Sequence, residues 1–550
     1  MIDPSLPRVT LHQFEVEYRD RHLIHAAVDH WAAQRPGDAA ILNASRGSRL
    51  TWAELQRGSV ALAAELSRMG FRKGDFLAAS LPLLNEHILL EYACFRLGVI
   101  HAPLDLRLQP AEVLRCLGLI RARGYAFHFA ALGEAVGRHC DSLEHLIQVA
   151  PPGECIAGAV SFADVMARAP SGVAPAPSDV TEQDGAQVIF TTGSTGSPKP
   201  ALLSHRGIAC QNLCLGTAFH FTPEQRVLCN LPASHVGGQA EVLMTTLFMG
   251  GTAVTLEVFD AVKSLDAMER LGVTLIGQIP AMFQLEWRTA DYGRRNLAGL
   301  RTAVYGGQAV PRPFMDEMLK MAPQIATGLG LTETSGFCTY TGLTGDAAAL
   351  ARGIGWAMPA YPMSIRQPMN GDGSAGAEVV AGEIGHVCFR GPQTFLGYVN
   401  DLQATAATLA KDGWLYTGDM GRVDEHGLHF SGRAKWVLKP SGYQVFPGDV
   451  ETHFSSLAGK VANIGVVGHP HRRWSEGIIA FVEKRPGADL TGAELRKHAR
   501  SLTAYMRPLH YVILEPGAMP LNRTAKVDVV RLQELAKEEV ARLRARGRWD

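Results

Sequence analysis

Residues 191–199 have the composition of a loop that binds a chain of phosphates. They read Thr-Thr-Gly-Ser-Thr-Gly-Ser-Pro-Lys and directly follow a short β-rich run, Gln-Val-Ile-Phe. Glycines let backbone N–H groups approach an anion, hydroxyl side chains donate hydrogen bonds, and a lysine supplies positive charge. The loop lacks the Gly-Lys-Ser/Thr ending of a Walker A motif. Because a Ser/Thr/Gly loop alone is most often an ordinary connector, the interpretation depends on the rest of the chain.

Further motifs follow this loop along the chain. They are LPASHVGG at 231–238, YGGQAV at 305–310, TGLGLTET at 327–334, GEIGHVCFRGPQTFLGYVN at 382–400, GWLYTGDMG at 413–421, GRAKWVLKPSGYQVFPGDVE at 432–451 and MPLNRTAK at 519–526. In type and order, the series resembles the adenylate-forming superfamily, which includes acyl- and aryl-CoA synthetases, the adenylation domains of peptide synthetases, and luciferases. The resemblance extends over nearly the whole chain.

The resemblance implies a two-step reaction that uses ATP, Mg²⁺ and coenzyme A. A carboxylate would attack the α-phosphate of ATP and release pyrophosphate, and a thiolate would then attack the acyl-adenylate and release AMP. The first step brings an anion to a polyanion, so cationic and hydrogen-bonding groups have to offset the repulsion. The expected activity is that of an AMP-forming carboxylate–CoA ligase, whose partners are a small carboxylic acid, ATP and CoA.

The same resemblance assigns nucleotide-binding roles to individual residues. Thr332 would contact the α-phosphate, and Glu333 would hold Mg²⁺, a hard cation that prefers oxygen ligands. Asp419 would accept both ribose hydroxyls, supported by Arg433. The residues expected at the β- and γ-phosphates are Thr191, Thr192, Gly193, Ser194, Thr195, Gly196 and Lys199.

Two further residues are expected to serve the acyl group. Lys526 would reach the acyl carboxylate and the α-phosphate during the first step, although Ala525 stands where the family usually has glycine. His235 would flank the acyl pocket and gate it against the thiol step. A histidine at this position is also consistent with a hydrogen-bonded core residue, and no partners at ligand spacing predict a metal there.

A hinge is expected near 433–435, because the family rotates its C-terminal domain between the two steps. Rotation would exchange the face that bears Lys526 for a face that bears Lys439 and Gly442. Trp436 departs from the acidic residue that usually adjoins the hinge.

The adenine site carries a second departure. The backbone of Gly306, Gly307 and Gln308 is expected to read the base edge, but Leu329 replaces the aromatic residue that stacks on adenine in the family. Leucine can cover the ring but lacks a flat π face. Pro200 replaces the last glycine of the phosphate loop and removes one backbone N–H, so no phosphate contact is expected through that N–H.

The segments expected to line the acyl pocket are 235–245, 305–308 and 327–337. They contain no Lys or Arg, so a second carboxylate on the substrate has no evident counter-ion. Apart from Glu333, their one charged residue is Glu241, which we expect on a helix with its side chain toward solvent. Apolar, glycine-rich segments suit an aryl, alicyclic or short-to-medium acyl group. The Phe-Asp element of amino-acid adenylation domains is missing, which argues against an amino-acid substrate.

Strands that alternate with helices are expected to position these motifs. Helical periodicity at 53–69 and 87–97 flanks an apolar run at 76–84, a pattern typical of a mostly parallel sheet with sites at its strand ends. Residues 242–256 are interpreted as helix, glycine turn and strand. From 433 onward the pattern changes to that of a smaller α+β unit. We therefore expect an α/β fold. A large N-terminal domain at 1–431 would have stacked αβ layers with a mostly parallel sheet and a small β-barrel-like part, and a small mobile α+β domain would follow at 432–550.

The bulk composition narrows the possible functions. The chain has 550 residues with 53 basic and 53 acidic side chains, so its formal net charge is zero. A neutral chain has no overall basic surface for nucleic acid or for an anionic membrane, and neither is an expected partner. The charged N-terminus does not resemble a secretory signal. Nine cysteines without a Cys-x-x-Cys pair fit a reduced, cytoplasmic protein.

Three alternatives to the CoA ligase remain open at this stage. They are an enzyme that loads a carrier-protein phosphopantetheine, an oxygenase of the luciferase type, and a non-catalytic descendant that binds acyl ligand or nucleotide. The sequence also leaves open whether the protein is a monomer or a homodimer.

Overall fold

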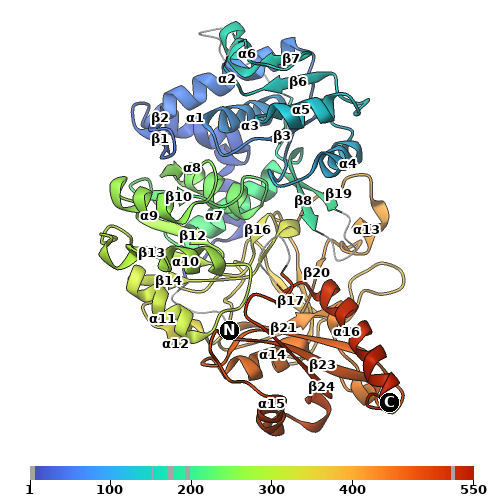
Figure 1. The fold of residues 1–550 in the computed structure, drawn as a ribbon. Coiled ribbons are helices and arrows are strands. Elements are labelled where there is room, and N and C mark those ends of the chain that lie inside the picture. The colour runs from blue at the N-terminus through green and yellow to red at the C-terminus, as the bar shows by residue number, and fades with distance from the viewer. Residues whose placement is uncertain (1–5, 152, 170–178, 193–197, 522–526) are drawn as a thin grey trace.

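The computed structural model describes residues 6–151, 153–169, 179–192, 198–521 and 527–550 (Figure 1). Two large sheets, a smaller antiparallel sheet, a two-stranded ribbon and a three-stranded sheet are connected mostly by helices. The predicted α/β class is confirmed. The structure differs from the expectation in one respect, because two large sheets take the place of one mostly parallel sheet, and Figure 1 shows them one above the other.

The first large sheet has the strand order β19-β9-β8-β4-β3-β5-β6-β7. Strands β3 to β8 run parallel, whereas β8 and β9 form an antiparallel hairpin to which β19 adds. The strands are β3 (Phe76–Ser80), β4 (Ile100–Pro103), β5 (Gly124–Phe127), β6 (His145–Gln148), β7 (Ala159–Ser161), β8 (Gly185–Thr192), β9 (Pro198–Ser204) and β19 (Gly397–Tyr398). The helices of this part are α1 (Ile24–Gln34), α2 (Trp52–Arg68), α3 (Asn85–Leu97), α4 (Pro110–Ile120), α5 (Ala130–Gly137) and α6 (Phe162–Arg168).

The second large sheet has the order β14-β13-β12-β10-β11-β1-β2 and is parallel except for the β1–β2 pair. Its strands are β1 (Ala39–Asn43), β2 (Ser48–Thr51), β10 (Arg226–Cys229), β11 (Thr252–Thr255), β12 (Leu275–Gln278), β13 (Thr302–Tyr305) and β14 (Gln324–Ala326). The helices around it are α7 (His205–Ala218), the π-helix η3 (Gly237–Met244), α8 (Thr245–Met249), α9 (Ala261–Arg270), α10 (Pro280–Trp287), α11 (Arg312–Met321) and α12 (Ala347–Leu350).

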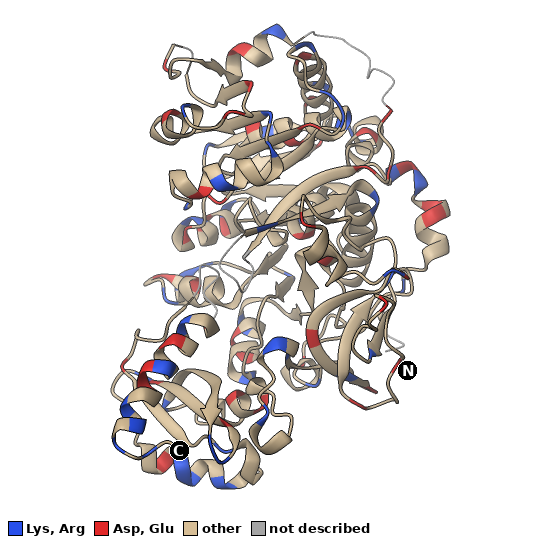
Figure 2. Ribbon diagram, turned by 90° about the vertical axis from the view of Figure 1, so that its right-hand side faces the viewer, with Lys and Arg blue, Asp and Glu red and all other residues tan. Residues whose placement is uncertain are grey.

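The expected small β part is an antiparallel sheet in the order β17-β18-β20-β21, and the C-terminal part is α+β as expected. The predicted domain boundary after residue 431 falls within β21, and the division into domains stays a prediction. Acidic and basic residues are interspersed over the molecule, as Figure 2 shows. The elements are β17 (Met363–Arg366), β18 (Gly385–Phe389), α13 (Leu402–Ala406), β20 (Leu415–Asp424), β21 (Gly427–Arg433), α14 (Pro447–Ser455), β22 (Val461–His471), β23 (Ser475–Lys484), α15 (Gly492–His498), β24 (His510–Leu514) and α16 (Val529–Ala545).

Several elements follow local sequence signals closely. Helix α2 begins with a capping box, in which Thr51 and Glu54 satisfy each other's backbone N–H groups. The segment at 242–256 forms a helix that ends at Gly250, with φ 84°, before β11 begins, as predicted. A glycine in the left-handed region ends a helix without steric cost. Among the described residues, no helix is long and apolar enough to cross a membrane.

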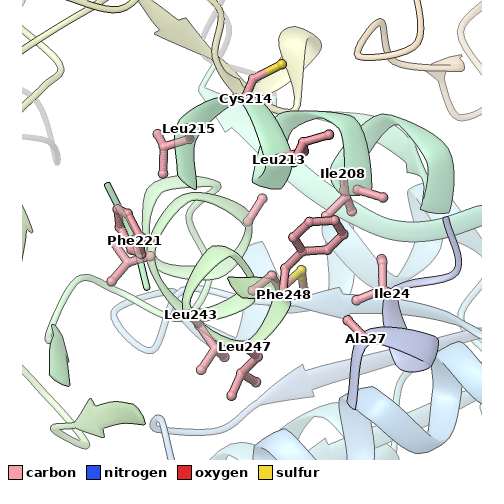
Figure 3. Close-up of a cluster of buried hydrophobic side chains, with 14 of the residues drawn as sticks. Ile24, Ala27, Ile208, Leu213, Cys214, Leu215, Phe221, Leu243, Leu247 and Phe248 are labelled. Carbon is pink, nitrogen blue, oxygen red and sulfur yellow. The ribbon is translucent and has the colours of Figure 1, made fainter. Parts of the chain in front are cut away.

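A large hydrophobic cluster joins α1, α7, η3 and α8 (Figure 3). Leu213 of α7, Leu243 of η3 and Leu247 of α8 are almost completely buried in it. Cys210 and Cys214 also lie buried on α7. The cluster supports η3, the helix that follows His235, and therefore one wall of the expected acyl pocket.

We predict that Leu247→Ala lowers the free energy of unfolding by about 2–5 kcal/mol, because it removes buried methyl groups and leaves a cavity. The matched control is Leu402→Ala, since the Leu402 side chain is 86% exposed. Thermal unfolding followed by calorimetry should show a clearly lower midpoint for Leu247→Ala and an unchanged midpoint for the control. Equal midpoints would contradict the assignment of this cluster to the core.

Candidate active site

The phosphate-loop residues flank the turn of the β8–β9 hairpin. Thr191 of β8 pairs with Lys199 of β9, and its hydroxyl donates to the Lys199 carbonyl at 3.4 Å. Gly193, Ser194, Thr195 and Gly196 lie outside the described residues, and Thr192 is described only as a strand residue. The Lys199 ammonium lies over the Tyr398 ring, 5.2 Å from its centroid. The hairpin thus directs one cation toward β19.

The hairpin accommodates the proline that replaces the family glycine. Pro200 pairs with Phe190 of β8, and its carbonyl accepts a hydrogen bond from the Val399 amide at 2.9 Å. In an antiparallel strand the N–H and C=O of one residue point to the same neighbour. The missing N–H of Pro200 would therefore face the β19 side, so the β8–β9 ladder loses no hydrogen bond to the proline.

A tight turn presents Thr332 and Glu333. This 3₁₀ turn, η5 (Thr332–Thr334), lies between the strands of a two-stranded ribbon, β15 (Gly330–Leu331) and β16 (Gly336–Phe337). The buried Thr334 hydroxyl donates to the Gly336 carbonyl at 2.7 Å and accepts from the Leu331 amide at 3.2 Å. Because Thr334 holds the turn from inside, the side chains of Thr332 and Glu333 remain partly exposed.

The segment that ends in β19 fastens this turn to the hairpin. The buried side-chain amide of Gln393 donates to the backbone carbonyls of Thr334 and Phe337. The backbone N–H of Phe395 donates to the Glu333 carbonyl. The Tyr398 hydroxyl then donates to Glu333 Oε1 at 2.5 Å. Burial raises the pKa of Tyr398 most, and the neighbouring Glu333 charge raises it further. The hydroxyl therefore keeps its proton, which it donates in the hydrogen bond to the carboxylate.

The expected ribose site is an ion pair across two strands. Asp419 of β20 pairs in register with Arg433 of β21, and Arg433 Nε lies 2.9 Å from Asp419 Oδ1. The Asp419 side chain is 2% exposed and that of Arg433 is 47% exposed. Partial desolvation, followed by the charges of Arg433 and Lys199, lowers the pKa of Lys435. The structure therefore brings cations from the hairpin and from the predicted hinge close together.

The adenine segment and the segment before η5 are joined at their strand ends. Thr327 donates its hydroxyl hydrogen to the Tyr305 carbonyl at 2.8 Å. Gly307 has φ 91°, and a Cβ on Gly306 would lie 3.0 Å from the Phe337 ring, so glycine suits both positions. Gln308 is exposed, and Leu329 is half-buried beside them.

The loop that carries His235 lies against this ribbon. The Gly237 amide donates to His235 Nδ1 at 3.2 Å, which places the proton of the neutral imidazole on Nε2. The expectation that Glu241 faces solvent is wrong. A Cβ on Gly330 would lie 2.9 Å from Glu241 Oε1, and a Cβ on Gly237 would lie 3.3 Å from Glu241 Oε2. Glu241 therefore lies between the His235 loop and the strand that leads to Thr332.

Of the predicted C-terminal site residues, the structure describes Lys439 and Gly442. The Lys439 amide donates to Glu476 at 2.5 Å, and Lys439 lines a cavity of about 280 Å³ with Arg366 and His386. Gly442 has φ 83°, in the left-handed region that favours glycine. Lys526 lies outside the described residues.

The donor set at Glu333 fits Mg²⁺. Magnesium in nucleotide sites is usually held by one or two carboxylates, by waters and by phosphate oxygens. Glu333 offers a partly exposed carboxylate that Tyr398 orients, on the side of the site where Lys199 lies. When bound, the ion would offset phosphate charge.

Sequence reasoning missed two residues that organise this site. Tyr398 and Gln393 both belong to the 382–400 motif, which was interpreted only as part of a resemblance. The signal that could have found Tyr398 is its place in a Gly-Tyr pair directly after the Phe395 segment. A tyrosine at the edge of a phosphate-binding hairpin is well placed to orient a carboxylate.

The chain is similar to known proteins in both sequence and fold. A family model described as "AMP-binding enzyme" matches residues 28–399, and one described as "AMP-binding enzyme C-terminal domain" matches residues 449–526. The chain is 32% identical to a feruloyl-CoA synthase of Amycolatopsis sp, over 84% of this chain and 89% of that protein. It is 30% identical to an indoleacetate–CoA ligase of Aromatoleum aromaticum, over 94% of this chain and 98% of that protein. ATP-bound MatB from Rhodopseudomonas palustris has the same fold, with a TM-score of 0.82 and 24% sequence identity. The match covers 94% of this chain and 99% of that chain.

We predict that Tyr398→Phe lowers kcat/KM for magnesium–ATP by about tenfold or more, because a hydrogen bond to a charged group contributes about 1.5–3 kcal/mol. Steady-state kinetics at varied Mg²⁺ should show the loss. Tyr416→Phe is the matched control, since Tyr416 is also 8% exposed and its hydroxyl donates to the Gln367 carbonyl. Equal kinetics for the two variants would contradict a role for Tyr398 at Glu333.

Proposed function

The chain belongs to the AMP-binding enzyme family and is an ATP-dependent acid–thiol ligase, and we propose that its acid substrates are monocarboxylic acids with an apolar body. The enzyme activates its acid with ATP and Mg²⁺ and transfers the acyl group to coenzyme A. We further propose that it acts in the cytoplasm, where ATP and CoA are abundant. All nine of its cysteines are free, which supports a reducing compartment.

The observation that best supports a nucleotide site is the convergence around Tyr398. Lys199 lies over its ring, Glu333 accepts its hydrogen bond, and the charge of Arg433 affects its pKa. Arg433 in turn pairs with the buried Asp419. Triphosphate, metal and ribose would thus find cations, a carboxylate and a hydrogen-bond acceptor within one continuous region.

Each group has a distinct role in the proposed mechanism. Lys199 and the other residues of its loop, Thr191 to Gly196, offset the charge of the β- and γ-phosphates, while Asp419 fixes the ribose. Thr332 donates to the α-phosphate and Lys526 stabilises the charge that develops there as the acid attacks. Positioning of this kind can supply about 7–11 kcal/mol in favourable cases. His235 remains a proposed gate between the acyl pocket and the thiol.

The substrate class follows from the charges along the acyl-pocket segments. These segments carry no Lys or Arg, and the structure adds the Glu241 carboxyl to the same region. A second carboxylate would be desolvated there without a counter-ion, which is costly. The two CoA ligases compared above carry the names of aromatic monocarboxylates, and this agrees with an apolar acyl body. The names of these two relatives specify CoA, which favours free CoA over a carrier protein as the acyl acceptor.

We predict acid-dependent ATP–pyrophosphate exchange, with catalytic efficiency at least tenfold higher for aryl, alicyclic or medium-chain monocarboxylates than for malonate or succinate. The exchange should require Mg²⁺. A broad acid panel, assayed with and without CoA, measures both properties. A preference for the dicarboxylates would overturn the substrate class, and no exchange with any acid from folded protein would favour a binding protein.

We predict that Lys526→Ala slows adenylate formation by about 10²–10³, the usual cost of losing such a charge-stabilising contact. Chemically supplied acyl-adenylate and CoA should still give acyl-CoA at a rate near that of the wild type, because a rotated domain would have carried Lys526 away. Gly442→Ala should do the reverse, and the exposed Lys537→Ala is the matched control. If Lys526→Ala slows both half-reactions equally, the two-orientation account fails for this chain.

A further inference from the structure

The Glu241 side chain lies against three glycines of the acyl-pocket segments. A Cβ on Gly336 would lie 2.7 Å from Glu241 Cγ, in addition to the close approaches at Gly330 and Gly237. These distances leave no room for a side chain at Gly330 or Gly336, the strand residues on either side of the turn η5. The carboxyl group is therefore fixed beside the strand that leads to the reacting residues.

A second polar group faces the same point. A Cβ on Gly336 would lie 3.0 Å from Gln211 Nε2, on the α7 side of the ribbon. Gln211 is completely buried, and its Nε2 has no hydrogen-bond partner in the part of the chain that the structure describes. Asn212 donates to Gln211 Oε1 at 2.8 Å, which fixes the amide with its NH₂ group toward Gly336. A buried amide donor without a partner is costly unless a ligand satisfies it.

Glu241 is suited to an uncharged ligand group. Burial raises the pKa of Glu241 to about 8, and a hydrogen bond from the Phe337 backbone only partly opposes this rise. Near neutral pH the group is mostly a carboxylic acid, which donates one hydrogen bond and accepts others. Together with Gln211, the pair offers N–H and O–H donors that match an oxygen acceptor.

We propose that Glu241 and Gln211 form a polar end of the acyl pocket, which selects acids that carry a hydroxyl or ketone oxygen on an otherwise apolar body. The proposal rests on the proposed function, since it assumes that these segments bind the acyl group. A substituent oxygen accepts from the Gln211 amide and from the Glu241 carboxyl, and a hydroxyl also donates to Glu241. An unsubstituted acid leaves the buried Gln211 amide unsatisfied and is therefore discriminated against.

The test compares two pairs of acids of matched shape. One pair is 4-oxocyclohexanecarboxylate and cyclohexanecarboxylate, and the other is 3-(4-hydroxyphenyl)propanoate and 3-phenylpropanoate. The measured quantity is the ratio of kcat/KM within a pair, because this ratio is independent of the fraction of active enzyme. The wild type should favour the oxygenated member of at least one pair by about tenfold or more, as expected for one well-made hydrogen bond.

The variants separate the two groups. Glu241→Leu and Gln211→Leu should each lower the ratio about tenfold, whereas Glu241→Gln should keep most of the preference because an amide also donates and accepts. Glu224→Leu, at an exposed position, is the matched control. A wild-type ratio near one in both pairs, or equal ratios for Glu241→Leu and the control, would overturn the inference and leave the proposed ligase intact. Failure of every acid to release AMP would instead overturn the proposed function.

Discussion

The hydrogen bond from Tyr398 to Glu333 is the interaction on which the arrangement of the site depends. Tyr398 belongs to β19, which pairs with the strand of the phosphate hairpin, while Glu333 belongs to a turn between two other strands. Without this connection the hairpin and the turn would be positioned by separate sheets. The Gln393 side chain and the Phe395 backbone N–H reinforce the same junction by donating to backbone carbonyls of the turn. A single short segment therefore sets the distance between the groups proposed for the phosphates and for the metal.

The charged residues of the site differ in their distribution from those of the whole chain. The chain is neutral overall, and its acidic and basic residues are mixed over the molecule in Figure 2. The site nevertheless combines Lys199, Arg433 and Lys435, and partial burial, together with the charges of Arg433 and Lys199, lowers the pKa of Lys435. These like charges repel one another, and a bound polyanion would relieve that repulsion. On the acyl side the polar groups are Glu241 and Gln211, which suit an uncharged ligand group.

The sequence predicted local elements well because their signals are local. The capping box at Thr51 and the glycine at Gly250 specify where one helix begins and another ends. It predicted one large sheet and not two, because strand order depends on contacts between distant segments. The orientation of Glu241 was wrong for a related reason. Helical periodicity finds the residue outside the buried face, and Glu241 is the one residue of η3 that is not fully buried, but the pattern does not show that this face meets the Gly330–Gly336 ribbon.

The central claim is that one acyl-adenylate lies across the groups joined by β19, and a crystal structure with a hydrolysis-resistant acyl-sulfamoyl adenosine tests it most directly. The account predicts the ribose hydroxyls on Asp419, the sulfamoyl group within hydrogen-bond distance of Thr332, and the acyl body between the His235 loop and Gly330. Binding of the analogue elsewhere, or with its ribose away from Asp419, would contradict the account.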